Sequence, residues 1–344
     1  MLSLSSFSVF ADNVPNAGLL LQQQTIQQYQ PQAEVNIEQP AQMQIAQADA
    51  QQQVKVEQIV ITGNQSISTA DLHALVADAE TKMLTLADLQ QLTKRITVYY
   101  QQQGYPYSRA YLPVQSLKNG VVKIAILEAK YDRIIINNQT KTSPQLIQAI
   151  LQPLQPGNII DSATLQQQLK LLNRLDGIQT RNIISAGRYA GTSDLTIDIQ
   201  PTSSLTGYVG LDNYGNEYTR EARLNAGVAL NNALGLGDRL TVDGMTSGNL
   251  NFGRLGYEAT INGIGTRLGA SYSDLAYELG KEYKALDATG TAQQISVWLN
   301  QPILLNNRSE VILGVQYDHK RLKDDISVAD IYRDRNIDVG RIRL

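Results

Sequence analysis

Between residues 205 and 344 the side chains alternate between apolar and polar with a period of two, and no other feature limits the fold so strongly. In the segment 221–231, Leu224 and Val228 fall on one face and Arg223 falls on the other. Because successive side chains of a strand point to opposite faces, this alternation predicts β-strands. The predicted strands are 205–212, 221–231, 238–246, 253–261, 266–273, 293–301 and 310–318.

Two folds produce such alternation: a soluble sandwich with its apolar faces inside, and a membrane β-barrel with its apolar face outward around a wet lumen. The predicted strands are about as long as a tilted bilayer crossing of roughly 9–11 residues requires. The polar face carries Arg and Glu, the turn at 262–265 is short, and 278–292 and 322–335 read as long charged loops. Tyr residues near strand ends fit an interfacial girdle: Tyr208, Tyr257, Tyr272, Tyr277 and Tyr317. These features favour the barrel over the sandwich.

Upstream of these strands, the order strand, helix, helix, strand, strand occurs twice in tandem. The first unit spans 54–129 and the second spans 130–202. In the first unit the segment 54–64 alternates and is rich in β-branched residues, which predicts a strand and turn, and a strand is also predicted at 108–115. A repeat of about 75 residues predicts two α+β domains of one fold before the all-β region.

The first 54 residues contain neither Lys nor Arg, unlike the rest of the chain. Residues 1–11 are apolar and small, with Val9 and Ala11 at positions typical of a signal-peptidase site, and are interpreted as a signal-peptide remnant. A short helix is predicted after Pro15, within 12–30. Gln dominates the region that follows, which predicts a flexible linker at 31–53.

The composition argues against several classes of function. Lys and Arg number 29 and Asp and Glu number 32, so the net charge of −3 leaves no basic footprint for nucleic acid. The absence of Cys excludes disulfide scaffolds and thiol nucleophiles, and His73 and His319, the two His, offer little for a metal site or a triad. No apolar run is long enough for a transmembrane helix. We therefore expect no catalytic site, no cofactor and no metal.

The ordered set of motifs resembles a known family, the outer-membrane transporters of two-partner secretion, also called hemolysin secretion/activation proteins. The repeat is similar to two POTRA domains. The residues that carry the resemblance in the repeat are Gly63-Asn64, Leu86, Leu89, Ile96 to Tyr100, Gly104-Tyr105, Pro113, Gln115, Gly120, Glu128, Pro156-Gly157, Leu165, Leu169, Leu172, Gly177, Gly191 and Leu195. Those in the barrel are Leu211 to Asn216, Asn231 to Leu240, Tyr317-Asp318 and Lys320.

The resemblance implies a fold and a function. The family has an N-terminal plug helix, a linker, two periplasmic POTRA domains and a sixteen-stranded outer-membrane barrel. Such a protein exports an unfolded β-helical exoprotein (an adhesin, a hemolysin or a contact-dependent toxin) without nucleotide. On this mapping 12–30 holds the plug helix and 203–344 is the front of the barrel. Outer-membrane lipid and the outer-membrane assembly machinery would be further partners, and nucleic acid would not.

The resemblance also implies two kinds of functional surface. POTRA sheets have exposed edges that can capture an extended client by strand addition. The candidate client-binding residues are Tyr105, Tyr107, Arg109, Tyr111, Leu112, Arg181, Ile183 and Ile184. The candidate lumen residues, which would hydrate the pore and hold the plug helix, are Glu221, Arg223, Arg254, Glu258 and Arg267. A purely structural role, in which the aromatics pack the sheet and the charges satisfy one another, remains an alternative for each set.

The sequence ends at Leu344, inside the expected eighth strand and before the family's VRGY-type motif. Half a barrel would leave unpaired backbone groups in lipid. We therefore expect either the front of a longer protein or a truncated product. Two other functions remain open: an outer-membrane insertion factor of the same superfamily, and a periplasmic protein-binding module that uses only the repeat.

Overall fold

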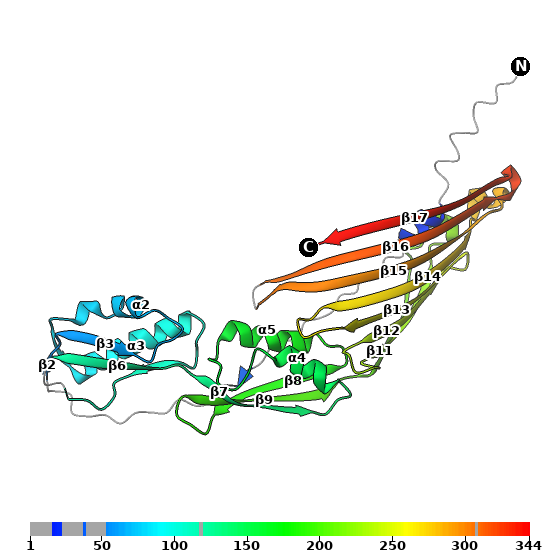
Figure 1. Cartoon of the computed structure of the whole chain (residues 1–344). Helices are drawn as coiled ribbons and strands as arrows, with labels where there is room; N and C mark the ends of the chain where they lie inside the picture. The colour runs from blue at the N-terminus through cyan, green and yellow to red at the C-terminus, as the bar shows by residue number, and fades with distance from the viewer. Residues whose placement is uncertain (1–15, 23–36, 39–52, 117–119, 307–308) are drawn as a thin grey trace, which may run out of the picture.

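The computed structural model describes residues 16–22, 37–38, 53–116, 120–306 and 309–344. Two α/β units and a curved β-sheet follow one another along an elongated molecule (Figure 1). The interpreted signal-peptide remnant at 1–11 and nearly all of the expected linker at 31–53 lie outside the described residues.

The first unit is a three-stranded sheet covered by helices. Its strands are ordered β3-β6-β5, with β6 parallel to β3 and antiparallel to β5, and a separate pair is formed by β2 and β4. The element bounds are β2 (Gln53–Lys55), β3 (Gln58–Thr62), α2 (Thr69–Ala74), η1 (Ala77–Ala79), β4 (Met83–Thr85), α3 (Leu86–Gln102), β5 (Arg109–Tyr111) and β6 (Val121–Leu127).

Two predicted strands of this unit are wrong in extent. The predicted strand 54–64 divides into β2 and β3, because the Val56 N–H donates to the carbonyl of Lys82, just before β4, and the Glu57 N–H donates to that of Gly120, just before β6. The predicted strand 108–115 shortens to β5, since Pro113 in this stretch has no N–H for a ladder.

Helix α3 fixes the core of the first unit. Thr85 and Asp88 form a capping box at its start. Leu89, Leu92, Ile96 and Tyr100 form its buried stripe, at the spacing of one helix face. The helix therefore packs its apolar stripe against the core of the first unit.

The second unit repeats the design with longer strands, β7 (Lys130–Asn138), β8 (Ile178–Ala186) and β9 (Thr192–Pro201), and with helices α4 (Pro144–Leu151) and α5 (Ser162–Asn173). Asp161 caps α5 by accepting from two backbone N–H groups of its first turn. The sheet order is β1-β8-β9-β7, where β1 (Ile37–Glu38) is a short strand from the N-terminal region that runs parallel to β8.

The third region is one antiparallel sheet in which every strand pairs with its neighbours in sequence, from β10 to β17. The strands are β10 (Leu205–Asp212), β11 (Arg223–Asn231), β12 (Arg239–Thr246), β13 (Leu250–Thr260), β14 (Arg267–Glu278), β15 (Ala288–Leu305), β16 (Glu310–Ile326) and β17 (Ile331–Arg343). Short 3-10 turns, η2 (Glu217–Thr219), η3 (Lys281–Leu286) and η4 (Ser327–Ala329), lie at one end. Within the described residues, β10 and β17 are the two edges.

The predicted long loop at 322–335 is largely strand, whereas the one at 278–292 keeps residues 279–287 outside the strands. Strands β14, β15, β16 and β17 run into them, and only η3 and η4 with their neighbours turn the chain. The charged side chains that read as loop signals instead pair across strands, as Arg321 of β16 does with Asp334 of β17 at 2.9 Å.

The two faces of the sheet differ in chemistry. One face, here called the outer face, is an exposed apolar band: Leu205, Val209, Leu211, Leu224, Val228, Leu230, Val242, Leu255, Leu268, Tyr272, Ile295, Val297, Leu299, Val315, Tyr317 and Ile342. The opposite, inner face is mainly polar. Tyr208 and Tyr277 differ from the predicted girdle, because their hydroxyls donate to Asp243 and Asp324 on the inner face.

The second unit is fixed to one end of the sheet, here called the proximal end. Gly235 and Gly263 lie in two of the strand turns there. A Cβ on Gly263 would lie 2.3 Å from the carbonyl oxygen of Ala149 in α4, and one on Gly235 would lie 2.5 Å from that of Lys141. The turns therefore meet the backbone of the second unit at a distance that only glycine allows.

Candidate functional site: the inner face of the sheet and two sheet edges

Helix α1 (Ala17–Gln22) lies against the inner face toward its distal end, away from the second unit. Ala17 and Leu20 are fully buried in a cluster with Phe252, Leu275 and Leu322 of the sheet. The rest of the expected plug helix lies outside the described residues. The short apolar helix therefore covers an apolar area of an otherwise polar face.

Asp324 of β16 holds the start of this helix. Its carboxylate accepts a hydrogen bond from the Ala17 N–H at 2.9 Å and another from the Tyr277 hydroxyl at 2.7 Å. Arg335 of β17 pairs with the same carboxylate at 2.6 Å. The group satisfies a backbone N–H that has no partner within the helix. Sequence reasoning missed it, because Asp324 stands in a segment that reads as loop.

The predicted lumen residues Arg223, Arg254, Glu258 and Arg267 all lie on the inner face. Arg223 pairs with Asp212 of β10 at 2.7 Å. Glu221 instead precedes β11, where its exposed side chain lies 3.9 Å from Lys281 of η3. The structure thus places four of the five predicted residues on the inner face and one in a distal loop.

Arg267 joins the sheet to the second unit. Its guanidinium lies 2.5 Å from Asp176 and 2.6 Å from Glu258, and it donates to the carbonyl oxygen of Arg174 at 3.0 Å. Its side chain is 7 % exposed, so the two carboxylates compensate a cation that is almost removed from water. Neither Asp176 nor Arg174 stood among the predicted site residues.

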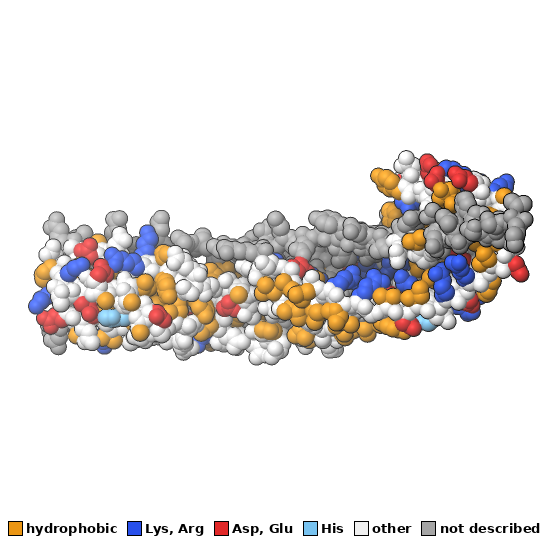
Figure 2. All heavy atoms as spheres, turned by 90° about the horizontal axis from the view of Figure 1, so that it is seen from above, with side chains coloured by type: hydrophobic (Ala, Val, Ile, Leu, Met, Phe, Trp, Pro, Cys, Tyr) orange, Lys and Arg blue, Asp and Glu red, His pale blue; other side chains and the backbone are white. Residues whose placement is uncertain are grey.

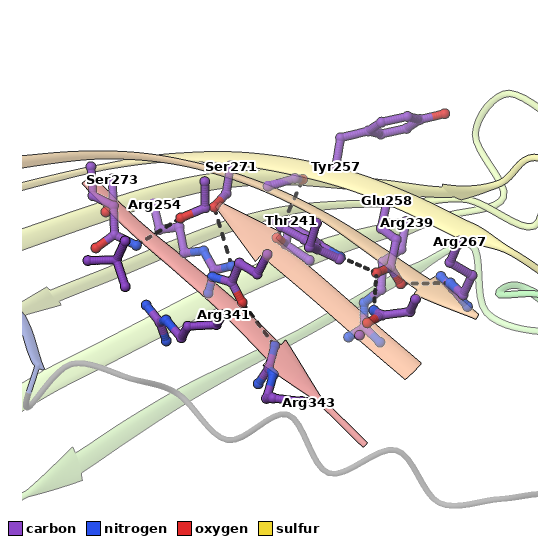
Figure 3. A pocket seen from close by; sticks show the side chains of 18 of the residues that line it. Arg239, Thr241, Arg254, Tyr257, Glu258, Arg267, Ser271, Ser273, Arg341 and Arg343 are labelled. Carbon is purple, nitrogen blue, oxygen red and sulfur yellow. Dashed lines mark hydrogen bonds and ion pairs between the residues drawn. The ribbon is translucent and has the colours of Figure 1, made fainter. Parts of the chain in front are cut away.

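A cavity of about 940 Å³ lies on the inner face between Arg267 and α1. Figure 3 shows Arg254, Arg341 and Arg343 pointing into it with Ser271 and Ser273, whereas the ring of Tyr257 points away. Figure 2 shows Lys and Arg side chains gathered over the part of the sheet next to the second unit. The alternation in the sequence predicts which face these side chains occupy. It does not predict that they cluster, because the clustering depends on the register between strands.

The predicted client-binding residues of the first unit divide into two groups. Arg109 and Tyr111 are exposed on β5, which pairs with β6 on one side only among the described residues. Tyr105 and Leu112 pack against the core of their own unit, and Tyr107 packs against the core of the second unit. Burial raises the pKa of the Tyr107 hydroxyl. The structure therefore brings two of the five to an open edge.

The predicted edge of the second unit is occupied by the chain itself. Residues Ile37 and Glu38 of β1 pair with Asn182 and Ile183 of β8. Ile184 is buried in the core of the second unit. A client strand could add to this part of β8 only after β1 had left.

Two negative observations concern the described residues. None of their helices is both long and apolar enough to cross a membrane. In the same part of the chain, no three His, Asp or Glu side chains gather as ligands for a metal ion.

Comparison with known proteins agrees with this geometry. Residues 54–129 match the family model of the ShlB-type POTRA domain, and residues 191–336 match that of the haemolysin secretion/activation protein ShlB/FhaC/HecB. The chain is 29% identical over 283 residues to the heme/hemopexin transporter protein HuxB of Haemophilus influenzae (strain 86-028NP), covering 81% of this chain and 50% of that protein.

A second relative and a solved structure belong to one group of transporters. The outer membrane transporter CdiB of Escherichia coli O6:K15:H31 (strain 536 / UPEC) is 27% identical over 274 residues, covering 77% of this chain and 46% of CdiB. The solved structure of CdiB from Escherichia coli superimposes with a TM-score of 0.69 at 24% identity over 85% of this chain and 55% of that one.

The chain spans about half the length of the curated relatives it matches. The matched regions include the first unit and most of the eight-stranded sheet, in the order that the motifs predict. By these matches the chain resembles the ShlB/FhaC/HecB haemolysin secretion/activation proteins.

Proposed function

We propose that this chain is the front part of an outer-membrane pore that receives an unfolded exoprotein through its POTRA units and passes it to the cell surface without nucleotide hydrolysis. The observation that carries the proposal is the eight-stranded sheet with an exposed apolar outer face and a polar, charged inner face. That division suits a wall with lipid on one side and water on the other.

The two POTRA units would act as the receiving surface. On the open edge of β5 the Ala110 N–H donates to the Thr97 hydroxyl at 3.0 Å, so an extended client would exchange with this bond, and Arg109 and Tyr111 flank the edge with one charge and one aromatic ring. The edge of β8 would become available when β1 leaves. Helix α1 and β1 lie on one N-terminal segment. If α1 left the inner face and β1 left β8 together, the space along the inner face and the edge of β8 would become available at the same time.

The first prediction concerns client capture at β5. In the whole transporter, the double change Arg109→Ala with Tyr111→Ala should lower export of the client protein into the medium by roughly tenfold, since both flanking contacts are lost. Quantitative blotting of the medium measures the effect.

The control is the double change Arg95→Ala with Tyr189→Ala, which removes the same residue types from exposed positions outside β5. Export should stay within twofold of the unchanged transporter. Unchanged export in the Arg109 and Tyr111 variant would remove β5 from the proposal.

Fractionation tests the membrane part of the proposal. A chain whose apolar outer face meets lipid should stay with the outer-membrane fraction and require detergent for release. Release into the periplasm by washing alone would instead favour the protein-binding module.

A further inference from the structure

The cavity on the inner face has an unequal set of charges. Seven of its lining residues are Arg or Lys, and the one side-chain carboxylate among them is Glu258. The cationic members are Arg174, Arg239, Arg254, Arg267, Lys320, Arg341 and Arg343. They come from the residue that follows α5 in the second unit and from five strands of the sheet.

Most of these cations already have carboxylate partners. Arg267 and Arg239 lie 2.5 Å and 3.9 Å from Asp176. Arg174 pairs with Glu310, and Arg341 pairs with Asp318, which is fully buried. The carboxylates neutralise these four cations, so the four contribute little to the binding of an anionic ligand.

Three cations are left without such a partner. The Arg254 guanidinium donates to the Ser271 hydroxyl at 3.4 Å, and the Arg343 guanidinium donates to the Gln316 side-chain oxygen at 2.9 Å. No described carboxylate forms an ion pair with Arg254, Lys320 or Arg343. Arginine keeps its charge at any physiological pH, and a concave protein wall concentrates the field of such charges.

We propose that this basic cavity binds a carboxylate-rich stretch of an extended polypeptide, so that acidic segments of the client are held on the inner face during passage. The proposal rests on the proposed function for the identity of the client. The proposal adds that the inner face prefers negatively charged segments of the client.

The distribution of the cations favours a polypeptide over a small anion. Arg254 lies on β13, Lys320 on β16 and Arg343 on β17, so they line the cavity from separate strands. A cavity of about 940 Å³ is much larger than one phosphate. Several carboxylates along one chain can reach several such cations together, with Ser271 and Ser273 as neutral donors beside them.

The test uses the whole chain, purified in detergent, and two labelled peptides of equal length, one of Glu, Ser and Gly and one of Lys, Ser and Gly. Fluorescence anisotropy should show the Glu peptide binding at least about tenfold more tightly than the Lys peptide, with affinity that falls as salt rises. Equal binding of the two peptides would overturn the proposal. Inorganic phosphate that displaced the Glu peptide when both were present at the same concentration of negative charge would also overturn the proposal.

Matched variants locate the binding. The double change Arg254→Gln with Lys320→Gln should weaken binding of the Glu peptide by roughly tenfold. The change Lys94→Gln with Lys123→Gln removes the same charge from exposed positions of the first unit and should leave binding within about twofold. Arg254→Lys keeps the charge and should bind like the unchanged chain. An equal loss in the Lys94 and Lys123 variant would contradict the proposal.

A second measurement needs no charge removed. The chain has no Cys, so Ser271→Cys can carry one fluorophore in the cavity. Iodide should quench this fluorophore more efficiently than caesium does, because the local potential is positive. Equal quenching by the two ions would overturn the proposal.

The outcomes separate this inference from the proposed function. Selective binding of the Glu peptide without client export by the whole transporter would contradict the proposed function and keep the basic cavity. Export of the client without charge-selective peptide binding would contradict this inference alone.

Discussion

Individual polar residues hold each of the two α/β units together more specifically than the apolar pattern shows. In the first unit, one carboxylate oxygen of Glu128 accepts from the Gln65 and Ser66 N–H groups and from the Tyr100 hydroxyl, all at 2.8 Å. Burial, and then the bond to Glu128, raises the pKa of Tyr100 well above its usual value. The hydroxyl therefore remains a donor throughout the physiological range.

An ion pair in the second unit makes its stability depend on pH. The hydrogen bonds from the Arg188 guanidinium and backbone N–H lower the pKa of Asp132 to about 2. An unfolded Asp titrates near ~3.9, so the stabilisation is complete above that pH and is lost as pH falls toward 2. We predict that thermal stability of the second unit falls over this window.

The variants Asp132→Asn and Arg188→Gln should each flatten this fall, because each removes one partner of the pair. Hydrogen exchange of the β7 and β9 amides at several pH values measures the change within the whole chain. A wild-type pH slope in both variants would show that another group is responsible.

At the scale of elements, helix α1 is held by one face. Leu20 is fully buried against the sheet, whereas the adjacent Leu19 is 51 % exposed. We predict that Leu20→Asp releases α1. A buried unpaired carboxylate costs several kcal/mol, which is on the order of the free energy that a six-residue helix can gain by docking on the sheet. Ala292→Cys, in the same buried cluster, reports the release by reacting roughly tenfold faster with a polar thiol reagent.

Leu19→Asp is the control, because it adds the same charge on the exposed side of the helix. The labelling rate of Ala292→Cys should then match that of the unchanged helix. Equal acceleration by both substitutions would mean that charge near α1, and not its buried contact, decides the exposure of Ala292.

The elements were predictable where a local pattern controls them. The strand expected at 205–212 has these bounds in the structure, and α3 follows its capping box and apolar stripe. The distal halves of β14 to β17 were not predictable, because their charged residues are stabilised by cross-strand pairs that the sequence does not reveal. The bond between Ala17 and Asp324 joins residues 307 positions apart, so local reasoning could not find it.

At the scale of the whole molecule, Arg267 couples the sheet to the second unit. We predict that Arg267→Gln loosens this connection, because it takes the close cation from the half-buried Glu258 and leaves Asp176 with Arg239 alone, 3.9 Å away. Spin labels at Gln167→Cys on α5 and Thr291→Cys on β15 should give a broader distance distribution in this variant.

Arg188→Gln is the matched control, since it removes an arginine from an ion pair within the second unit. Its distance distribution should remain as narrow as that of the unchanged chain. An equally narrow distribution in Arg267→Gln would show that the turns alone hold the two regions together.

The packing of Tyr107 of the first unit into the second, and of the sheet turns onto α4, has a mechanical consequence. A bond between the Ser162 N–H and the Gly104 carbonyl, 2.8 Å long, adds to the first of these joints. The edge of β5 and the proximal end of the sheet are therefore held at a fixed distance from each other. A client bound at β5 would have to present a stretch of that length before its next segment reached the sheet. The spacing of segments along the client, as well as their composition, would then decide what enters.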